Sequence, residues 1–280
     1  MSKIDECKFG IYEKAFSQDL SLEQILEKAK NMNLDYVELS IDESDKRLER
    51  LNWSTAVKKE LVRTECNLGI AFESICLSAH RKYPLGSENS ELVSKSLDIA
   101  QKAIQLAAEL GIRTIQLAGY DVYYEEHTAA TESRFSENLS KVVGIAAKYG
   151  VCLGFETMET PFMNTCEKAM HFVKSLDSPY LQLYPDIGNL SNAAKEYKKS
   201  VATDLDSAKG HIVAVHAKET LPGIFRNLSF GDGHTDFTTL IPKCYDMGVR
   251  RFVCELWAND NPKWQSNIEK AVATVKKALQ

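Results

Sequence analysis

The segment VCLGFE, residues 151–156, is a short, mainly apolar run that ends in a carboxylate. Three later segments are similar apolar runs that end in a carboxylate or an imidazole: LQLYPD (181–186), IVAVH (212–216) and RFVCE (251–255). Apolar runs of this length are typical of parallel strands that are buried on both faces. A charged or imidazole group at the end of such a strand must lie at a rim or be paired, because burying it alone is costly.

These four runs belong to a chain in which strand-like and helix-like segments alternate from end to end. Strands are predicted at 8–12, 36–41, 70–77 and 114–118, and four more end at Glu156, Asp186, His216 and Glu255. Helices are predicted after a cap at Ser21 and at 53–66, 88–110, 129–149, 167–176, about 193–207, 237–247 and 262–279. Glycines that follow several of these helices are typical helix stops.

Strict alternation of this kind predicts parallel β/α topology, and eight units can close a TIM barrel. An open, doubly wound sheet is the alternative. It would normally carry a glycine-rich phosphate loop after the first strand, where residues 10–14 offer only Gly10. We therefore predict a single (β/α)8 barrel over residues 1–280, with the active site at the C-terminal ends of the strands.

The lengths of the connections indicate which end of the barrel is functional. The connections that follow strands are long and polar: 42–52, 78–90, 119–128, 157–165 and 218–235. The connections that lead into strands, such as 31–35 and 111–113, are short. Barrel enzymes place their chemistry on the loops that follow the strands.

Composition excludes several classes of protein. The net charge of −5 and a pI near 5.8 argue against a nucleic-acid or anionic-membrane surface, which needs a basic field. No run approaches the 18 or more apolar residues of a membrane span, and the first residues do not have the order of a signal peptide. The seven cysteines form no CxxC pair, so we expect reduced thiols in a cytoplasmic protein.

The four terminal side chains predict a metal site. Glu156, Asp186, His216 and Glu255 should meet at one rim, because the carboxyl ends of parallel strands lie together. Three carboxylates and one imidazole suit a single divalent ion, Mn²⁺, Mg²⁺, Co²⁺ or Zn²⁺, and exclude a thiolate site. The neighbouring His211 stands at the entry of its strand, where we expect a structural role.

Several longer segments resemble a known family: GIYEKA (10–15), VELSIDE (37–43), CLSAHR (76–81), PLGS (84–87), IQLAGYDVYY (115–124), QLYPDIGNLS (182–191), HIVAVHAKET (211–220) and FGDG (230–233). They are similar to the bacterial L-ribulose-5-phosphate (L-xylulose-5-phosphate) 3-epimerases of the xylose-isomerase-like superfamily, which share a Glu, Asp, His, Glu set on strands five to eight. Ala217, Glu219 and Asp232 depart from the family pattern of Val, Asp and Glu, and none of them is a proposed ligand.

The resemblance implies metal-dependent inversion at C3 of a phosphorylated ketopentose, in pentose and L-ascorbate catabolism. Inversion through a planar enediolate favours two acid/base groups on opposite faces, a role that the resemblance gives to Glu156 and Glu255. The metal would stabilise the enediolate, with Asp186 and His216 acting mainly as ligands.

Further side chains are candidates for the substrate. The substrate phosphate needs cationic donors, and the candidates are Arg81, Lys218 and Arg226. Sugar hydroxyls could be bound by two residues of the same rim, His80 and Asn189. Three glutamates are candidates for orienting the ligands: Glu13, Glu38 and Glu73. Apolar positions on the outer helices permit a homodimer.

Three rival functions use the same barrel. An aldose–ketose or hydroxypyruvate-type isomerase would share the metal site but move the carbonyl group. An abasic-site endonuclease implies a three-zinc cluster and a basic face, which six histidines and a net negative charge disfavour. A non-catalytic sugar-phosphate sensor would be expected to lack one of the two glutamates.

Overall fold

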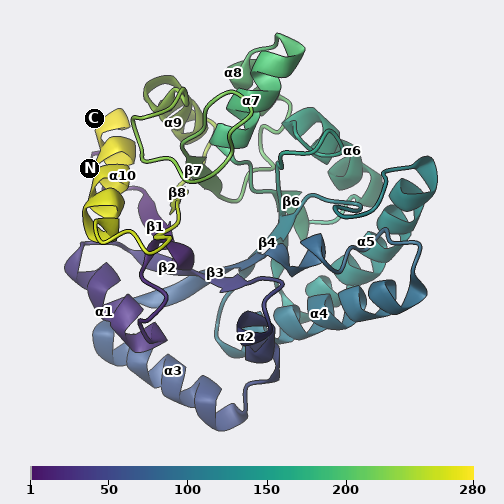
Figure 1. Cartoon of the computed structure of the whole chain (residues 1–280), viewed down its shortest axis with the longest axis horizontal. Helices are drawn as coiled ribbons and strands as arrows, with labels where there is room; N and C mark the ends of the chain where they lie inside the picture. The colour runs from purple at the N-terminus through teal and green to yellow at the C-terminus, as the bar shows by residue number, and fades with distance from the viewer. Residues whose placement is uncertain (1) are drawn as a thin grey trace.

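Eight parallel strands form one curved sheet in the computed structural model, which describes residues 2–280 (Figure 1). The sheet has the strand order β6-β5-β4-β3-β2-β1-β8-β7. The strands are β1 (Lys8–Tyr12), β2 (Tyr36–Ile41), β3 (Ala71–Leu77), β4 (Thr114–Ala118), β5 (Cys152–Glu156), β6 (Leu181–Leu183), β7 (Val215–Lys218) and β8 (Arg251–Glu255). The predicted barrel is thereby confirmed.

Strands β6 and β7 close the ring through single bridges. Leu183 pairs with Ile212, and Asp186 pairs with His216, both in the parallel sense. The backbone N–H of His216 donates to the carbonyl of Pro185 at 3.0 Å. The seam of the barrel therefore lies between the two segments that carry Asp186 and His216.

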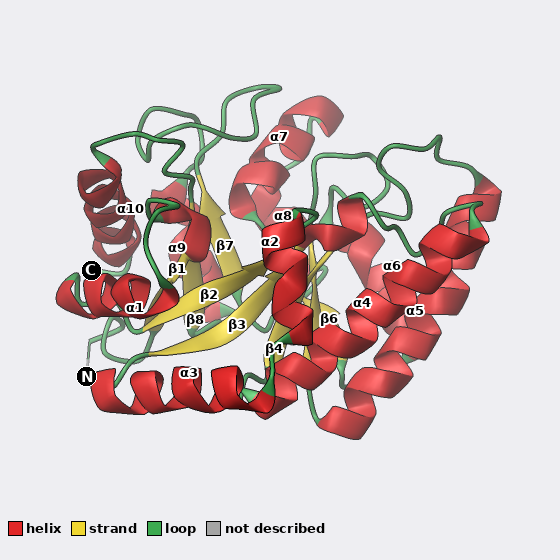
Figure 2. Ribbon diagram, turned by 60° about the horizontal axis from the view of Figure 1, so that its bottom comes forward, coloured by secondary structure: helices red, strands yellow, loops and turns green. Residues whose placement is uncertain are grey.

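Ten α-helices cover the outside of the sheet within residues 2–280 (Figure 2). They are α1 (Leu22–Asn31), α2 (Asp45–Leu48), α3 (Thr55–Leu68), α4 (Ser90–Glu109), α5 (Ala129–Tyr149), α6 (Cys166–Leu176), α7 (Ile187–Tyr197), α8 (Val201–Asp206), α9 (Phe237–Asp246) and α10 (Trp264–Ala278). Three short 3₁₀ turns lie at 13–15, 49–52 and 78–81.

Local chemistry explains where most helices begin and end. Ser21 caps α1, as the sequence predicts, and in the structure it forms a capping box with Gln24. Gly150 follows α5 with a φ of 65°, a left-handed conformation that favours glycine.

The sequence prediction is wrong in the segment after β6. The strand stops at Leu183 rather than at Asp186, because Pro185 has no N–H for a ladder and the Asp186 carboxylate instead caps α7. The helix predicted at 193–207 is two helices, α7 and α8, and Lys198 separates them in a left-handed conformation with a φ of 53°.

Strand β7 also differs from the prediction. It begins at Val215 and continues through His216 to Lys218, so His216 is not its last residue. The residues before Val215 form only the isolated bridge at Ile212. The connection predicted as a loop at 42–52 contains α2 and a 3₁₀ turn.

Apolar packing within residues 2–280 forms one large region and two smaller ones. The large region fills the space between the sheet and the helices. A smaller one lies inside the barrel and consists of Tyr12, Tyr36, Cys76, Tyr184, Ala214 and Val253. Within residues 2–280, no helix has both the length and the apolar character that a membrane crossing requires.

Gly188 allows α7 to approach β7 closely, next to the seam. A Cβ atom at this position would lie 2.5 Å from the backbone carbonyl oxygen of Lys218. We predict that Gly188→Ala lowers the free energy of unfolding by roughly 1–3 kcal/mol, because the backbone must shift to relieve the overlap.

Gly144 provides the matched control, since a Cβ atom there meets nothing within 4 Å. Gly144→Ala should raise the free energy of unfolding by about 0.5–1 kcal/mol, the usual gain in a helix interior. Urea unfolding at neutral pH measures both changes, and equal effects of the two substitutions would contradict the close approach at Gly188.

Candidate metal centre and active site

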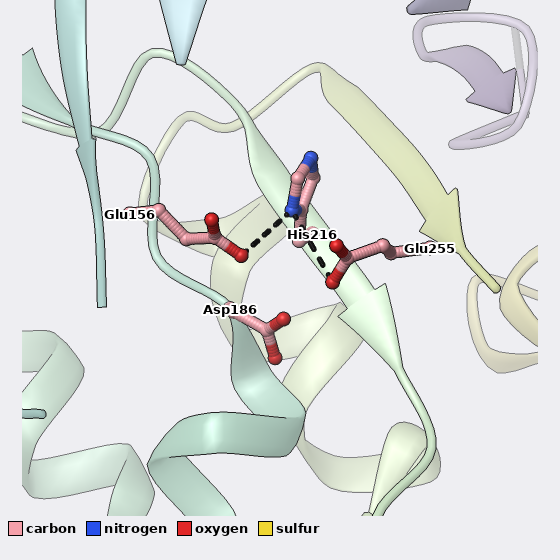
Figure 3. A group of neighbouring side chains, drawn as sticks. All are labelled: Glu156, Asp186, His216 and Glu255. Carbon is pink, nitrogen blue, oxygen red and sulfur yellow. Dashed lines mark hydrogen bonds and ion pairs between the residues drawn. The ribbon is translucent and has the colours of Figure 1, made fainter. Parts of the chain in front are cut away.

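Four side chains meet at the C-terminal mouth of the barrel. Glu156 ends β5, Asp186 precedes α7, His216 lies in β7 and Glu255 ends β8. One donor atom from each lies within 4.8 Å of the others, and all four residues are buried. Figure 3 shows the four side chains converging, with Glu156 and Glu255 on either side of His216. The constellation predicted from the four apolar runs is therefore assembled in the structure.

The imidazole of His216 is held from two directions. Its Nδ1 atom lies 3.1 Å from Oε1 of Glu156 and 3.7 Å from Oε2 of Glu255. Its Nε2 atom lies 2.6 Å from Oε1 of Glu38 in β2. The nitrogen that faces the carboxylate cluster is thus Nδ1.

Of the three glutamates predicted to orient ligands, only Glu38 contacts one of the four. Glu13 pairs with Arg50, whose Nη2 lies 2.6 Å from its Oε1. Glu73 pairs with Lys8 at 2.7 Å and with Arg251 at 2.5 Å, away from the cluster.

Lys218 lies among the carboxylates rather than at the surface. Its Nζ atom is 2.6 Å from Oδ2 of Asp186 and 3.1 Å from Oε2 of Glu255. Its side chain is only 6% exposed. A lysine two residues past a ligand in an extended strand points to the same face as that ligand, which explains its position.

The buried carboxylates have strongly perturbed pKa values. Burial raises the pKa of Glu156, and the nearby Glu255 raises it further. Burial also raises the pKa of Asp186 to about 8, in spite of the ammonium of Lys218. Burial alone would raise the pKa of Glu255, but Lys218 and His216 outweigh it and lower that pKa to about 2. Ionising all three carboxylates together therefore requires more positive charge than the side chains supply.

A divalent cation fits this donor set. Glu38, Glu156, Asp186 and Glu255 place four carboxylates in or beside the cluster, against one permanently charged side chain, Lys218. Within residues 2–280, the buried Oδ2 atom of Asp186 and the buried Oε2 atom of Glu255 form ion pairs with Lys218 but have no hydrogen-bond partner. Three oxygens and one imidazole nitrogen are ligands that Mn²⁺, Co²⁺ or Zn²⁺ accepts, and that Mg²⁺ can also use.

Gln116 is part of the site although the sequence analysis does not single it out. Its Nε2 group donates a hydrogen bond to Oε2 of Glu156, and the residue is fully buried in β4. The signal in the sequence is an amide in the middle of an apolar strand, because a buried polar group requires a partner.

A cavity of about 110 Å³ opens beside the cluster. Two carboxylates and four cationic side chains are among the residues that line it. Its lining residues are Tyr12, Lys14, Cys76, Ser78, Arg81, Glu156, Met158, Lys218, Arg226, Glu255 and Trp257. The three residues predicted to bind the phosphate, Arg81, Lys218 and Arg226, therefore line the same space as two of the predicted metal ligands.

Comparisons with known proteins agree with this geometry. The family model described as the xylose isomerase-like TIM barrel matches residues 26–278. The chain belongs to this family. It is also 42% identical over 269 residues to the L-ribulose-5-phosphate 3-epimerase UlaE of Escherichia coli O139:H28, across 96% of this chain and 91% of that protein. An UlaE protein of Escherichia coli O157:H7 matches equally well.

The resemblance to the L-ribulose-5-phosphate 3-epimerases is thereby confirmed, and the chain is an enzyme of the carbohydrate epimerase class. Among solved structures, a D-tagatose 3-epimerase-like protein superposes with a TM-score of 0.76 at 20% identity, covering 98% of this chain and 100% of that one. An L-ribulose 3-epimerase superposes with a TM-score of 0.73 at 18% identity, covering 97% and 95%. These two structural matches support the fold.

Two arginines of this epimerase-family chain line the cavity. Arg226 lies 2.8 Å from Oε1 of Glu159, whose other oxygen accepts from the hydroxyl of Tyr120. The guanidinium of Arg81 lies 5.0 Å from the ring centroid of Tyr123. Its Nε atom is buried and has no hydrogen-bond partner among residues 2–280.

Asn189 lies beside the cluster and supports it. Its backbone N–H donates to Oδ1 of Asp186 at 2.8 Å, and its side-chain amide donates to the carbonyl of Thr157 at 2.8 Å. His211 contacts Oε1 of Gln182 at 2.9 Å, at the entry to β7. The two residues thus brace the segments on either side of the seam.

His80 faces α4 and is not among the residues that line the cavity. Its Nε2 atom lies 3.3 Å from the carbonyl of Ser96, and the residue is 1% exposed. Burial lowers the pKa of His80 to about 4, although the contact with Ser96 acts in the opposite direction. Contact of His80 and Asn189 with the sugar stays a prediction.

The low pKa of His80 predicts a pH-dependent stability. The folded protein keeps this imidazole neutral, whereas the unfolded chain protonates it below its ordinary pKa of 6.5. The stabilisation is therefore present above about pH 6.5 and is lost as the pH falls towards 4. Between pH 7.5 and pH 5, wild type should lose about 2 kcal/mol that His80→Gln does not lose. Urea unfolding of both proteins at the two pH values measures this difference, and parallel losses would contradict it.

Proposed function

We propose that this protein is a metal-dependent epimerase that interconverts L-ribulose 5-phosphate and L-xylulose 5-phosphate by inversion at C3. The observation that carries the proposal is the placement of Glu156 and Glu255 on two sides of one buried donor cluster (Figure 3). The 42% identity to an L-ribulose-5-phosphate 3-epimerase supports this choice of substrate.

Two carboxylates on opposite sides suit the chemistry. Inversion at C3 removes the proton next to the C2 carbonyl and returns one to the other face of the planar enediolate. One of Glu156 and Glu255 acts as the base and the other as the acid, and they exchange roles in the reverse direction. Burial of both groups excludes water that would compete for the proton.

Glu156, Asp186, His216 and Glu255 would hold one divalent ion, whether Mn²⁺, Zn²⁺, Mg²⁺ or Co²⁺. When bound, the ion supplies positive charge that stabilises the developing enediolate. Gln116 restrains the Glu156 carboxylate through its hydrogen bond, and Asn189 restrains Asp186 in the same way. Lys218 adds a second positive charge next to Asp186 and Glu255, so we place it at the reacting end of the sugar.

Arg81 and Arg226 are the proposed phosphate ligands. Both guanidinium groups line the cavity, and planar guanidinium groups bind phosphate oxygens in pairs. Glu159 offsets one of the two charges, which leaves the mouth with net positive charge for an incoming dianion. Arg226 also lies 6.0 Å from the ring of Trp257, a contact that limits its movement.

The physiological setting follows from the substrate. A ketopentose phosphate is an intermediate of pentose and L-ascorbate catabolism, which we propose as the context for this enzyme in the cytoplasm. The seven cysteines, all free thiols in the structure, are consistent with a reducing compartment. Nucleic acid and membranes are not proposed partners, and a homodimer stays a prediction.

Isotope exchange separates an epimerase from the rival isomerase. We expect L-xylulose 5-phosphate, incubated with the Mn²⁺-loaded enzyme in heavy water, to acquire deuterium at C3 while the carbonyl remains at C2. Nuclear magnetic resonance and mass spectrometry of the recovered sugars locate the label. Deuterium at C1 together with an aldose product would identify an aldose–ketose isomerase and overturn the proposal.

The two glutamates should both be essential for turnover. Glu156→Gln and Glu255→Gln each keep the shape of the side chain but remove the proton-transfer group, so each should reduce kcat by roughly 10²-fold or more. Circular dichroism checks that the fold is retained. Glu137→Gln is the matched control, because Glu137 is exposed and pairs with Lys141 on α5. Near-normal turnover by either site variant would refute the role of that glutamate.

A further inference from the structure

We infer that Glu38 is a positioning residue of the metal site, which fixes the ring of His216 so that Nδ1 is offered to the cation. The inference rests on the proposed metal-dependent function. Glu38 is in the middle of β2, is 0% exposed and has no direct access to the cavity. A carboxylate buried at that depth requires compensating donors.

Three neighbouring elements supply those donors. The Oε1 atom of Glu38 lies 2.6 Å from Nε2 of His216 in β7. Its Oε2 atom accepts a hydrogen bond from the hydroxyl of Ser74 in β3 at 2.8 Å. The same oxygen accepts a second hydrogen bond, at 3.0 Å, from the hydroxyl of Tyr184, just after β6. With three partners, the carboxylate has a fixed position and orientation inside the barrel.

The aromatic ring of Tyr184 also contacts His216 directly. The two ring centroids are 4.8 Å apart at an interplanar angle of 60°. Tyr184 therefore restrains His216 by packing and restrains Glu38 by hydrogen bonding. This arrangement leaves the imidazole one position in which Nε2 meets Glu38 and Nδ1 faces Glu156 and Glu255.

The position of the His216 ring determines which of its two nitrogens can bind a metal ion. A neutral imidazole has one N–H and one lone pair, and only the lone pair can bind a metal ion. When Glu38 accepts the proton of Nε2, the lone pair resides on Nδ1, within the donor cluster. The negative charge of Glu38 also raises the basicity of that lone pair, as carboxylates behind metal-binding histidines generally do.

A purely structural role makes a different prediction. If Glu38 only joined β2 to Ser74 and Tyr184, its loss would reduce stability but leave the metal affinity unchanged. If Glu38 positions His216, the metal affinity must fall even where the fold is intact.

Calorimetric titration of the metal-free protein with Mn²⁺ distinguishes these roles. We expect Glu38→Gln to raise the Kd for Mn²⁺ roughly 10- to 100-fold, the usual effect of removing such a carboxylate. Glu73→Gln, the same change on the neighbouring strand β3, should leave the Kd unchanged, because Glu73 contacts Lys8 and Arg251 instead. An unchanged Kd in folded Glu38→Gln would overturn the inference.

A second variant covers the case in which Glu38→Gln does not fold. Tyr184→Phe keeps the ring against His216 but removes one donor to Glu38, and it should raise the Kd for Mn²⁺ several-fold. If Glu38→Gln is unfolded and Tyr184→Phe binds Mn²⁺ like wild type, the inference fails.

Proton nuclear magnetic resonance reports on the imidazole ring of His216 directly. In the Zn²⁺-loaded wild type, the Nε2 proton of His216 should resonate far downfield and exchange slowly with water, because it is buried against Glu38. In Glu38→Gln this signal should move upfield, and the same signal in both proteins would overturn the inference. Failure of wild type itself to bind Mn²⁺ or Zn²⁺ would instead remove the proposed metal function on which the inference rests.

Discussion

Repulsion among buried carboxylates is the constraint around which the mouth of this barrel is organised. Glu156, Asp186 and Glu255 lie within one cluster, and Glu38 lies behind it. Such a group is stable only if positive charge is placed among its members. Lys218 supplies part of that charge, and a divalent cation would supply the remainder. The same requirement creates a site that can stabilise a negatively charged enediolate.

The contacts that close the barrel also position the side chains of the site. The seam between β6 and β7 is joined by the bridge from Asp186 to His216, two of the four proposed ligands. Asp186 also caps α7 through the backbone N–H of Asn189. Gly188 lets that helix pack against the carbonyl of Lys218. Each of these contacts limits the movement of a ligand, so the geometry of the site depends on the regular packing of the second half of the barrel.

The barrel and the four converging side chains can be predicted because both depend on local patterns. Apolar runs identify buried parallel strands, and their carboxyl ends must share a face. The seam departs from that pattern, because Pro185 interrupts the ladder and Asp186 becomes a helix cap. As a result, α7 begins at Ile187, earlier than the sequence predicts. The pairing of Glu38 with His216 joins residues 178 positions apart, and only the closed ring brings them together. Sequence spacing likewise places Lys218 on the correct face but does not reveal its depth among the carboxylates.

The central claim is that Glu156, Asp186, His216 and Glu255 share one cation. Anomalous X-ray scattering from crystals grown with Mn²⁺ tests it most directly. The account predicts a single strong peak at the mouth of the barrel, with one atom of each of the four side chains at about 2.0–2.3 Å. An anomalous peak at another site, or a structure with Mn²⁺ in which the four side chains do not point to one position, would contradict it.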